Sequence, residues 1–369
     1  MGAQLRNSRN VSTKRVMAEP MPIVITDADA ARLLSIPEAI EAMRVAFRDL
    51  AEGRAVNPPR LRYGIETPDP GRRYTANIHA GAVQSYSVAC VRAGSHFTVA
   101  TNDPQRKALA DPDGPNWTII VLYDLNTGEP LAFMHESYLS GLRVGATSAL
   151  AVAEVARPDA SVLGLFGTGQ QALPGCRAIC AVRPIKRVQV FSPNPAHRQA
   201  FVQRMAGESV EVVAVDDPRE VVRGAHVVCC ATNSKQPVLH GNWLEPGQMV
   251  ITIANSDVLN TRREVDEVTF ARASAIIIND WESVTANRQV ELLEPIEKGL
   301  VRRENVHTLG DLVAGMAELR HDPGAIVYYK NNTGLAMQFA ACGAIIHRKL
   351  AAEGTERTIP RDWFASERS

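Results

Sequence analysis

The sequence predicts an α/β protein in which a domain with a doubly wound parallel sheet is inserted into a discontinuous α+β domain. Three observations lead to this fold class. Short β-rich runs alternate with helical segments between residues 161 and 279, as in a parallel sheet with helices on both faces. Shorter strands separated by turns precede that region, and an Ala-rich helical segment follows it. A length of 369 residues also suits about two domains.

The first part of the discontinuous domain is predicted at residues 23–157. A helix begins after Ser35 and Pro37, because apolar residues recur at helical spacing from there to Leu50. Between residues 61 and 132, short apolar runs are separated by Gly, Pro and Asp, which predicts strands joined by turns. We therefore expect an α+β region with a mainly antiparallel sheet.

A hairpin and a long helix complete this part. The apolar runs 118–124 and 130–134 flank the turn Asn126-Thr127-Gly128, which is a hairpin pattern. An Ala-rich helix then extends from Tyr138 to Ala156 and carries Arg143 near its start.

The inserted domain is predicted at residues 158–308. Its six β-rich runs are residues 161–166, 187–192, 210–215, 226–231, 249–253 and 275–279. Residues 309–352 are expected to be a helical return that packs on the first domain. Residues 1–22 are expected to be a disordered extension, and residues 353–369 a frayed polar tail.

Composition narrows the classes of function. A net charge of zero provides no broad field to hold nucleic acid or an anionic membrane, so chemistry on a small molecule is favoured. No apolar run is long enough to span a membrane and residues 1–22 lack the apolar stretch of a secretory signal, so a cytoplasmic location is expected. The six cysteines have neither CxxC nor zinc-ligand spacing, and we expect no metal site.

A glycine-rich turn indicates a nucleotide. The run 162–166 is a buried-strand pattern, and a helix is predicted directly after the turn. In that context a GxGxxA sequence is typical of a Rossmann dinucleotide-binding unit, whose helix N-terminus binds the phosphates. The residues expected to contact the cofactor are Gly167, Thr168, Gly169, Gln170 and Gln171.

The end of the second β-rich run bears on the choice of cofactor. An acidic side chain there would bind the ribose hydroxyls of NAD and repel the 2′-phosphate of NADP. The sequence has no acid at this place, and Ser192, Asn194 and Arg198 can instead accommodate a phosphate. NADP is therefore favoured over NAD. Thr232, after the fourth run, is a further expected contact of the cofactor.

Several landmarks in the same order carry a family resemblance: Pro59-Arg60, Gly128–Ala132, Leu142–Ala149, Gly167–Ala172 and Gly334–Gln338. Together they resemble the ornithine cyclodeaminase/μ-crystallin family, from about Ile23 to Ala351. The resemblance implies a homodimer whose discontinuous substrate and dimerisation domain flanks the Rossmann domain. It also implies redox chemistry at an α-carbon that bears nitrogen and a carboxylate, with a small amino, imino or keto acid as the substrate.

The resemblance assigns roles to four residues. Arg60 and Arg143 match positions that bind the substrate carboxylate, a task suited to the planar guanidinium group. Asp257 matches the acidic residue that transfers protons to or from the substrate nitrogen. Arg92 stands where the family commonly has a lysine, so this second candidate catalytic residue can bind a carboxylate but cannot readily act as a base.

Further polar residues belong to the same predicted region. His79 and His96 are candidates for contacts with a second polar group of the substrate, although structural histidines are an equal alternative. With Arg60, Arg92 and Arg143 near the ligand, the sequence favours a substrate with one or more carboxylates, such as an imino or keto dicarboxylic acid. Pairing of two arginines with Asp or Glu from elsewhere would weaken that argument.

Three functions remain open from the sequence. The leading hypothesis is an NAD(P)H-dependent imine or ketimine reductase, which in reverse is an amino-acid dehydrogenase. The first alternative is a cyclodeaminase, a lyase that releases ammonia and returns its hydride to the product. The second is a nucleotide-dependent binding protein of the μ-crystallin kind.

Overall fold

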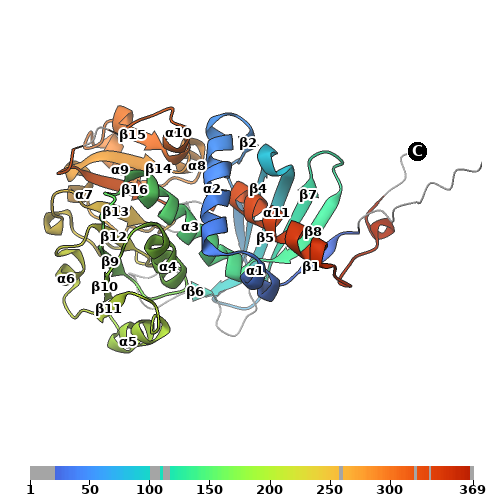
Figure 1. The fold of residues 1–369 in the computed structure, drawn as a ribbon, viewed down its shortest axis with the longest axis horizontal. Helices are drawn as coiled ribbons and strands as arrows, with labels where there is room; N and C mark the ends of the chain where they lie inside the picture. Colours follow the sequence, from blue (N-terminus) through green and yellow to red (C-terminus); the bar gives the residue numbers. More distant parts are fainter. Residues whose placement is uncertain are drawn as a thin grey trace, which may run out of the picture.

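The computed structural model describes residues 21–99, 109–110, 117–256, 261–319, 322–331 and 334–365. Two eight-stranded sheets form the two halves of the molecule, and helices α2 and α3 lie between them (Figure 1). The predicted fold class, a Rossmann domain combined with a second α+β domain, is confirmed. No helix in the described part of the chain is long and apolar enough to cross a membrane.

The first sheet has the strand order β1-β8-β7-β5-β4-β2, with β3 paired to β4 and β6 paired to β5. All pairs are antiparallel except the parallel pair β1–β8. The strands are β1 (Ile23–Ile25), β2 (Ala55–Val56), β3 (Leu61–Glu66), β4 (Arg72–Val83), β5 (Val88–Val99), β6 (Leu109–Ala110), β7 (Trp117–Asp124) and β8 (Pro130–His135). The predicted antiparallel sheet and its hairpin are thus both present.

Helices cover one face of this sheet. They are α1 (Asp27–Leu33), α2 (Ile36–Ala51), α3 (Ser137–Val155) and α11 (Ala336–Glu353), with a short 3₁₀ turn at Gln84–Tyr86 between β4 and β5. Ser35 caps α2 as predicted, because its hydroxyl accepts from the Glu38 amide while the Glu38 carboxylate accepts from the Ser35 amide. The chain comes back to the first sheet as helix α11, which packs on β4 and β5.

The second sheet is entirely parallel, with the order β11-β10-β9-β12-β13-β16-β14-β15. Its strands are β9 (Val162–Phe166), β10 (Arg187–Phe191), β11 (Glu211–Ala214), β12 (Val227–Cys230), β13 (Met249–Thr252), β14 (Ala273–Ile278), β15 (Val306–Thr308) and β16 (Ile326–Lys330). The chain reverses its direction of winding between β9 and β12, so the carboxyl ends of these strands border the crevice where such sheets bind ligands.

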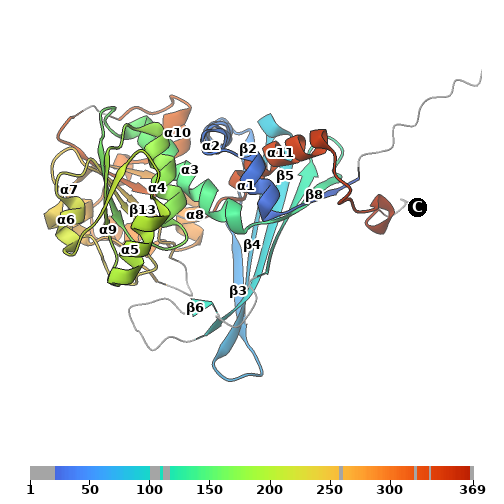
Figure 2. The same ribbon diagram turned by 60° about the horizontal axis from the view of Figure 1, so that its bottom comes forward.

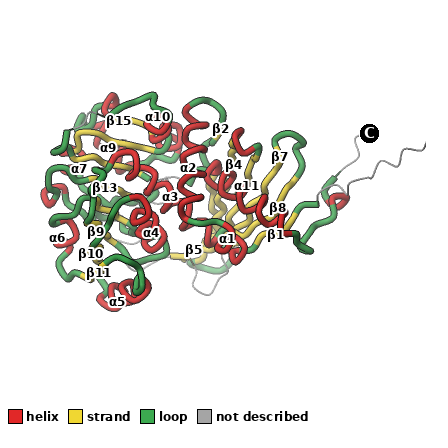
Figure 3. The backbone as a smooth tube through the Cα atoms, in the orientation of Figure 1, coloured by secondary structure: helices red, strands yellow, loops and turns green. Residues whose placement is uncertain are grey.

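Helices lie on both sides of the second sheet (Figures 2 and 3). They are α4 (Ala172–Val182), α5 (Pro195–Arg204), α6 (Pro218–Val222), α7 (Glu267–Arg272), α8 (Trp281–Ala286), α9 (Val290–Glu297) and α10 (Leu309–Val313), with 3₁₀ turns at Gly241–Trp243 and Arg303–Asn305. A further 3₁₀ turn, Arg361–Trp363, lies beside the first sheet, where Phe364 packs against Phe133 of β8. One hydrophobic cluster runs from the first sheet through α3 and α4 to this one, so the two halves share a core.

Two predictions about the end of the chain were wrong. Residues 309–352 are not a purely helical return, because β16 lies between β13 and β14 inside the second sheet. The run Ile-Val-Tyr-Tyr before Lys330 is the β-rich pattern that indicates it. Residues 357–359 are not a frayed tail either. They pair with β1 through backbone hydrogen bonds. The prediction was based on the polar side chains of this segment, and these do not show backbone pairing.

Candidate active site

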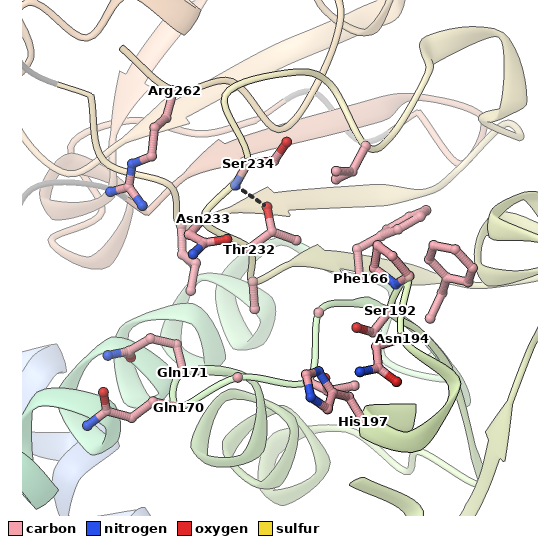
Figure 4. A pocket seen from close by; sticks show the side chains of 18 of the residues that line it. Phe166, Gln170, Gln171, Ser192, Asn194, His197, Thr232, Asn233, Ser234 and Arg262 are labelled. Carbon is pink, nitrogen blue, oxygen red and sulfur yellow. Dashed lines mark hydrogen bonds between the residues drawn. The ribbon is translucent and has the colours of Figure 1, made fainter. Parts of the chain in front are cut away.

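A cleft of about 950 Å³ opens at the carboxyl ends of β9, β10, β12 and β13. It brings together eight of the residues that the sequence predicts to contact a cofactor (Figure 4): Gly167, Thr168, Gly169, Gln170, Gln171, Ser192, Asn194 and Thr232. These residues come from three separate strand ends. The parallel topology therefore gathers them at one edge of the sheet.

The glycine turn is tightly packed on one side and open on the other. Gly167 has φ +101°, and a β-carbon there would lie 2.3 Å from the carbonyl oxygen of Ala231. At Gly169 a β-carbon would meet no atom within 4 Å. Gln171, the residue before α4, has a buried Oε1 without a hydrogen-bond partner in the described structure. Open space over Gly169 beside a helix N-terminus fits a pyrophosphate.

Among the described residues, those that line the far end of the cleft are polar or basic and none is acidic. Asn194 caps α5 by accepting from the Ala196 amide over 2.9 Å. His197 and Arg204 also line the cleft, and Arg204 donates to the carbonyl of Thr168 over 2.7 Å.

Arg198 is placed differently from the other predicted cofactor contacts. It does not line the cleft, and its guanidinium donates to the Ser192 carbonyl over 2.7 Å and to the Asp216 carboxylate over 2.5 Å. These bonds give it a structural role, holding the loop after β10. Contact between Arg198 and a cofactor phosphate stays a prediction.

Glu264 lies behind the wall of the cleft and forms hydrogen bonds with residues of that wall. Its carboxylate is fully buried and accepts four hydrogen bonds, from the amide and hydroxyl of Thr232 and from the amides of Ile253 and Ala254, over 2.7–2.8 Å. Thr232 and Ile253 line the cleft. Burial raises the pKa of Glu264 to about 7, against the opposing charge of Lys330.

A buried ion pair supports Glu264 in turn. Glu291 and Lys330 are paired with both side chains fully buried, and Glu291 also accepts from the amides of Glu264 and Val265. The ammonium of Lys330 donates to the carbonyl of Ala254 over 2.8 Å. This network ties β16 and α9 to the strand ends that form the cleft.

A second group of candidate residues lies on the helix-covered face of the first sheet. His79 of β4 and Arg92 of β5 are direct cross-strand partners. Arg92 forms a 2.8 Å ion pair with Glu136, the residue that precedes α3. His96 lies on the same face of β5, four residues from Arg92, opposite Thr75.

Helices α3 and α11 add Arg143 to this group. Its Nη1 donates to Oε1 of Gln338 over 2.8 Å. The Phe339 ring stacks against both guanidinium groups, with its centroid 4.8 Å from Arg143 and 5.9 Å from Arg92. Two of the three arginines predicted to bind substrate therefore meet at one aromatic ring. We call the group of His79, Arg92, Glu136 and Arg143 the arginine cluster.

The members of the cluster are close enough to shift the pKa values of His79 and Arg143. Burial holds the pKa of His79 well below its usual value, and three positive charges lower it further, those of Arg92, Arg60 and Arg143. Burial also lowers the pKa of Arg143 to about 10, while the Glu136 carboxylate acts in the opposite direction. His79 is thus a neutral imidazole at pH 7, and its Nδ1 lies 2.6 Å from the carbonyl of Gly334.

Arg60 connects the first half of the molecule to the second. Its Nε donates to Asn287 over 2.9 Å, and its Nη2 donates to Asn255 over 3.1 Å and to the Ser256 carbonyl over 3.5 Å. Asp257 itself lies outside the described residues. Arg60 therefore reaches the segment that directly precedes the predicted proton-transfer residue.

Helix α3 links the part of the molecule with the arginine cluster to the part with the cleft, because it carries Arg143 and packs on α4, the helix after the glycine turn. A methyl group added at Gly141, two residues before Arg143, would lie 3.7 Å from the carbonyl oxygen of Gln170 in the glycine turn. The Rossmann cleft, with polar residues from three strand ends, places the protein in the class of dinucleotide-binding oxidoreductases. The chain belongs to the ornithine cyclodeaminase/mu-crystallin family, whose model matches residues 21–354. This confirms the family predicted from the sequence motifs.

Individual relatives cover most of the chain. A protein of Sinorhizobium fredii named as an uncharacterized cyclodeaminase is 30% identical over 303 residues, which are 80% of this chain and 86% of the relative. A Δ1-pyrroline-2-carboxylate reductase of Bacillus cereus is 26% identical over 339 residues, 91% and 99% of the two chains. The solved Δ1-pyrroline-2-carboxylate reductase of Thermococcus litoralis, in complex with NADH and L-proline, has 25% identity and a TM-score of 0.78, covering 90% of this chain and 98% of that one.

Sequence reasoning did not find several residues of the site. Glu136 and Glu264 belong to no motif that marks a site, and only the fold brings them to Arg92 and Thr232. Gln338 is part of a family landmark, which was the one available signal for it. Arg204 lies at the end of α5, beyond the part of the sequence where nucleotide contacts are usually sought.

Proposed function

We propose that the protein is an NAD(P)H-dependent reductase of carboxylated imines, which in the reverse direction is an α-amino-acid dehydrogenase. The observation that carries the proposal is the meeting of two part-buried arginines, Arg92 and Arg143, at the ring of Phe339, in a protein whose other half has a dinucleotide cleft. The Bacillus cereus and Thermococcus litoralis relatives, named as reductases of a cyclic imino acid, support it.

The residues divide the work between binding and proton transfer. When bound, the nicotinamide cofactor supplies or accepts the hydride. We propose that the guanidinium groups of Arg92 and Arg143 bind the substrate carboxylate. Arg60 positions the wall of the pocket. Asp257 is assigned the proton that the substrate nitrogen gains on reduction. Arg92 stays charged throughout and does not act as a base.

The experiment is a substrate screen. The purified protein is incubated with NADPH or NADH and a panel of cyclic imino acids, or pyruvate or oxaloacetate with an amine, and absorbance of the reduced cofactor is followed. Consumption with at least one carboxylated imine is expected. No consumption with any member of the panel would count against the proposal.

A cyclodeaminase is the second candidate, favoured by the name of the Sinorhizobium fredii relative. Its net reaction needs no added reductant. Release of ammonia and proline from ornithine with catalytic amounts of NAD would support it over the reductase. Because Arg92 stays charged where the family commonly has a lysine, proton removal from the amine is assigned to Asp257 for either candidate.

We propose NADP as the preferred cofactor. No acidic side chain lines the far end of the cleft, and His197 and Arg204 are available beside Ser192 and Asn194. A positive side chain there favours a 2′-phosphate. A ratio of kcat/KM for NADPH over NADH above one is expected, and Arg204→Gln is expected to lower that ratio; a preference of the wild type for NADH would contradict it.

We propose that the protein forms a homodimer through the open face of the first sheet. Leu61, Tyr63 and Ile65 of β3 are 49–65% exposed, as are Trp117 and Ile119 of β7. The cross-strand register puts Leu61 and Ile119 in one row across β4 and β5. β3 and the adjoining part of β4 extend beyond the helices (Figure 2).

A contiguous apolar face of this kind marks an interface between proteins. Ile65→Asp is expected to yield monomers in size-exclusion chromatography with light scattering, whereas Met316→Asp, at an equally exposed methionine of the other half, is expected to leave the dimer intact. A wild-type protein that is monomeric at micromolar concentration would contradict this proposal.

A further inference from the structure

The ion pair between Arg92 and Glu136 leaves polar atoms without a partner. Nη2 of Arg92 donates to Oε2 of Glu136, and the two side chains are only 13% and 6% exposed. Nε and Nη1 of Arg92, and Oε1 of Glu136, are buried and have no hydrogen-bond partner in the described structure. Nε of Arg143 is in the same state. The cluster thus combines unsatisfied donors on two cations with an unsatisfied acceptor on one anion.

Such atoms are uncommon in folded proteins and require an explanation, of which a bound ligand is one. Guanidinium donors match a carboxylate, because their planar geometry suits both of its oxygens. A free carboxylate oxygen matches an N–H donor and repels a second carboxylate. A ligand that carries a carboxylate next to a protonated nitrogen satisfies all these atoms together.

The charge of Glu136 also changes what the number of arginines implies. Three arginines near one ligand favour a dicarboxylic acid, but Glu136 neutralises Arg92 and adds a negative group to the cluster. Arg60, for its part, is occupied by Asn287 and Asn255. The cluster therefore offers one strong carboxylate site rather than two.

Resting on the proposed function, we propose that Glu136 is the specificity-determining residue of the substrate site. Its Oε1 accepts a hydrogen bond from the substrate nitrogen, while Arg92 and Arg143 bind the neighbouring carboxylate. The site then selects α-amino and α-imino monocarboxylic acids over dicarboxylic acids. Glu136 is a different group from Asp257, to which we assign proton transfer.

The test compares ligands that differ in the nitrogen alone. Binding to the protein loaded with NADPH, which cannot oxidise an amino acid, is measured by calorimetry for three pairs: L-proline with tetrahydrofuran-2-carboxylate, L-alanine with propionate, and L-aspartate with succinate. A charge-assisted hydrogen bond corresponds to a preference of about 10- to 100-fold. We expect the wild type to prefer the nitrogen compound of at least one monocarboxylic pair by at least about tenfold.

Glu136→Gln is expected to bring that preference close to one. Its amide oxygen stays with Arg92, so its NH₂ group faces the substrate nitrogen, and two donors then oppose each other. Glu154→Gln is the matched control, because Glu154 lies on α3, the helix that follows Glu136, and pairs with Arg44 outside the cluster. The control is expected to keep the wild-type preference.

Three results would overturn the proposal: Glu136→Gln retaining the preference, succinate binding the wild type more tightly than L-proline and L-alanine, or no binding of any of the six ligands. If Glu136→Gln does not fold with Arg92 unpaired, the double variant Glu136→Gln/Arg92→Met removes both charges. The preference must be lost there too. Because no hydride transfer is needed, a failed turnover screen with the preference intact would refute the proposed function alone.

Discussion

The glycine turn allows a paired test in which one substitution is expected to damage the fold and the other only the function. Gly167→Ala places a β-carbon 2.3 Å from the carbonyl oxygen of Ala231, at a φ of +101° that L-residues rarely adopt. The backbone conformation costs about 1–2 kcal/mol, and displacing a neighbouring strand costs about 1–3 kcal/mol more. We expect a loss of about 2–5 kcal/mol in the free energy of unfolding.

Gly169→Ala is the matched variant two residues away. Its β-carbon meets no protein atom within 4 Å, so the free energy of unfolding should stay within about 0.5 kcal/mol of the wild type. The added methyl group occupies the space assigned to the pyrophosphate, so affinity for NADPH should fall at least tenfold. Urea denaturation and fluorescence titration with NADPH measure the two quantities. Wild-type stability of Gly167→Ala, or wild-type NADPH affinity of Gly169→Ala, would refute the reasoning.

Three further predictions concern buried charges. Lys330→Met leaves Glu291 buried and unpaired and should lower the free energy of unfolding by about 3–5 kcal/mol; adding Glu291→Gln should recover part of this loss, and a double variant worse than the single one would contradict it. The pKa of His79 is well below that of the unfolded chain, so the unfolded state binds the extra proton. Stability should therefore fall as the pH drops below about 6.5, and His79→Gln should lack this loss. The pKa of Glu264 is raised to about 7, so the folded state binds the extra proton and stability should fall as the pH rises from about 4.5 to 7. The wild type should lose about 3 kcal/mol of stability over this pH range, and Glu264→Gln should not. Equal slopes in both proteins would rule the assignment out. Because the last two effects oppose each other in the wild type, each needs its own variant.

Local patterns were predictable, whereas pairings across the fold were not. The turn at Gly167 is preceded by a buried strand and followed by a helix, so its structure depends on neighbours in the sequence and was predicted with its contacts. β16 was missed because an apolar run of five residues between helical segments has no period that separates a buried strand from a helix.

The arginine cluster shows the same limit at the level of single side chains. Arg92 and Arg143 were predicted from family motifs, but their partners Glu136 and Gln338 come from elsewhere in the chain and depend on how α3 and α11 cross the sheet. The possibility that an arginine is neutralised by a distant acid was foreseen in general, and Glu136 is that acid. Which acid it is depends on the register of β4 and β5 and the position at which α3 begins.

The two faces of the first sheet constrain how this protein can vary in evolution. On β4 and β5 the inward residues carry the arginine cluster, and the outward residues belong to the open apolar face. Because side chains alternate along a strand, insertion or deletion of one residue within β5 would exchange the two faces downstream and disrupt the cluster and the apolar face together. Changes of two residues preserve the alternation, and changes in the turn at Gln84–Tyr86 leave both strands in place. Length variation among functional descendants should therefore be confined to that turn or occur within the strands in steps of two.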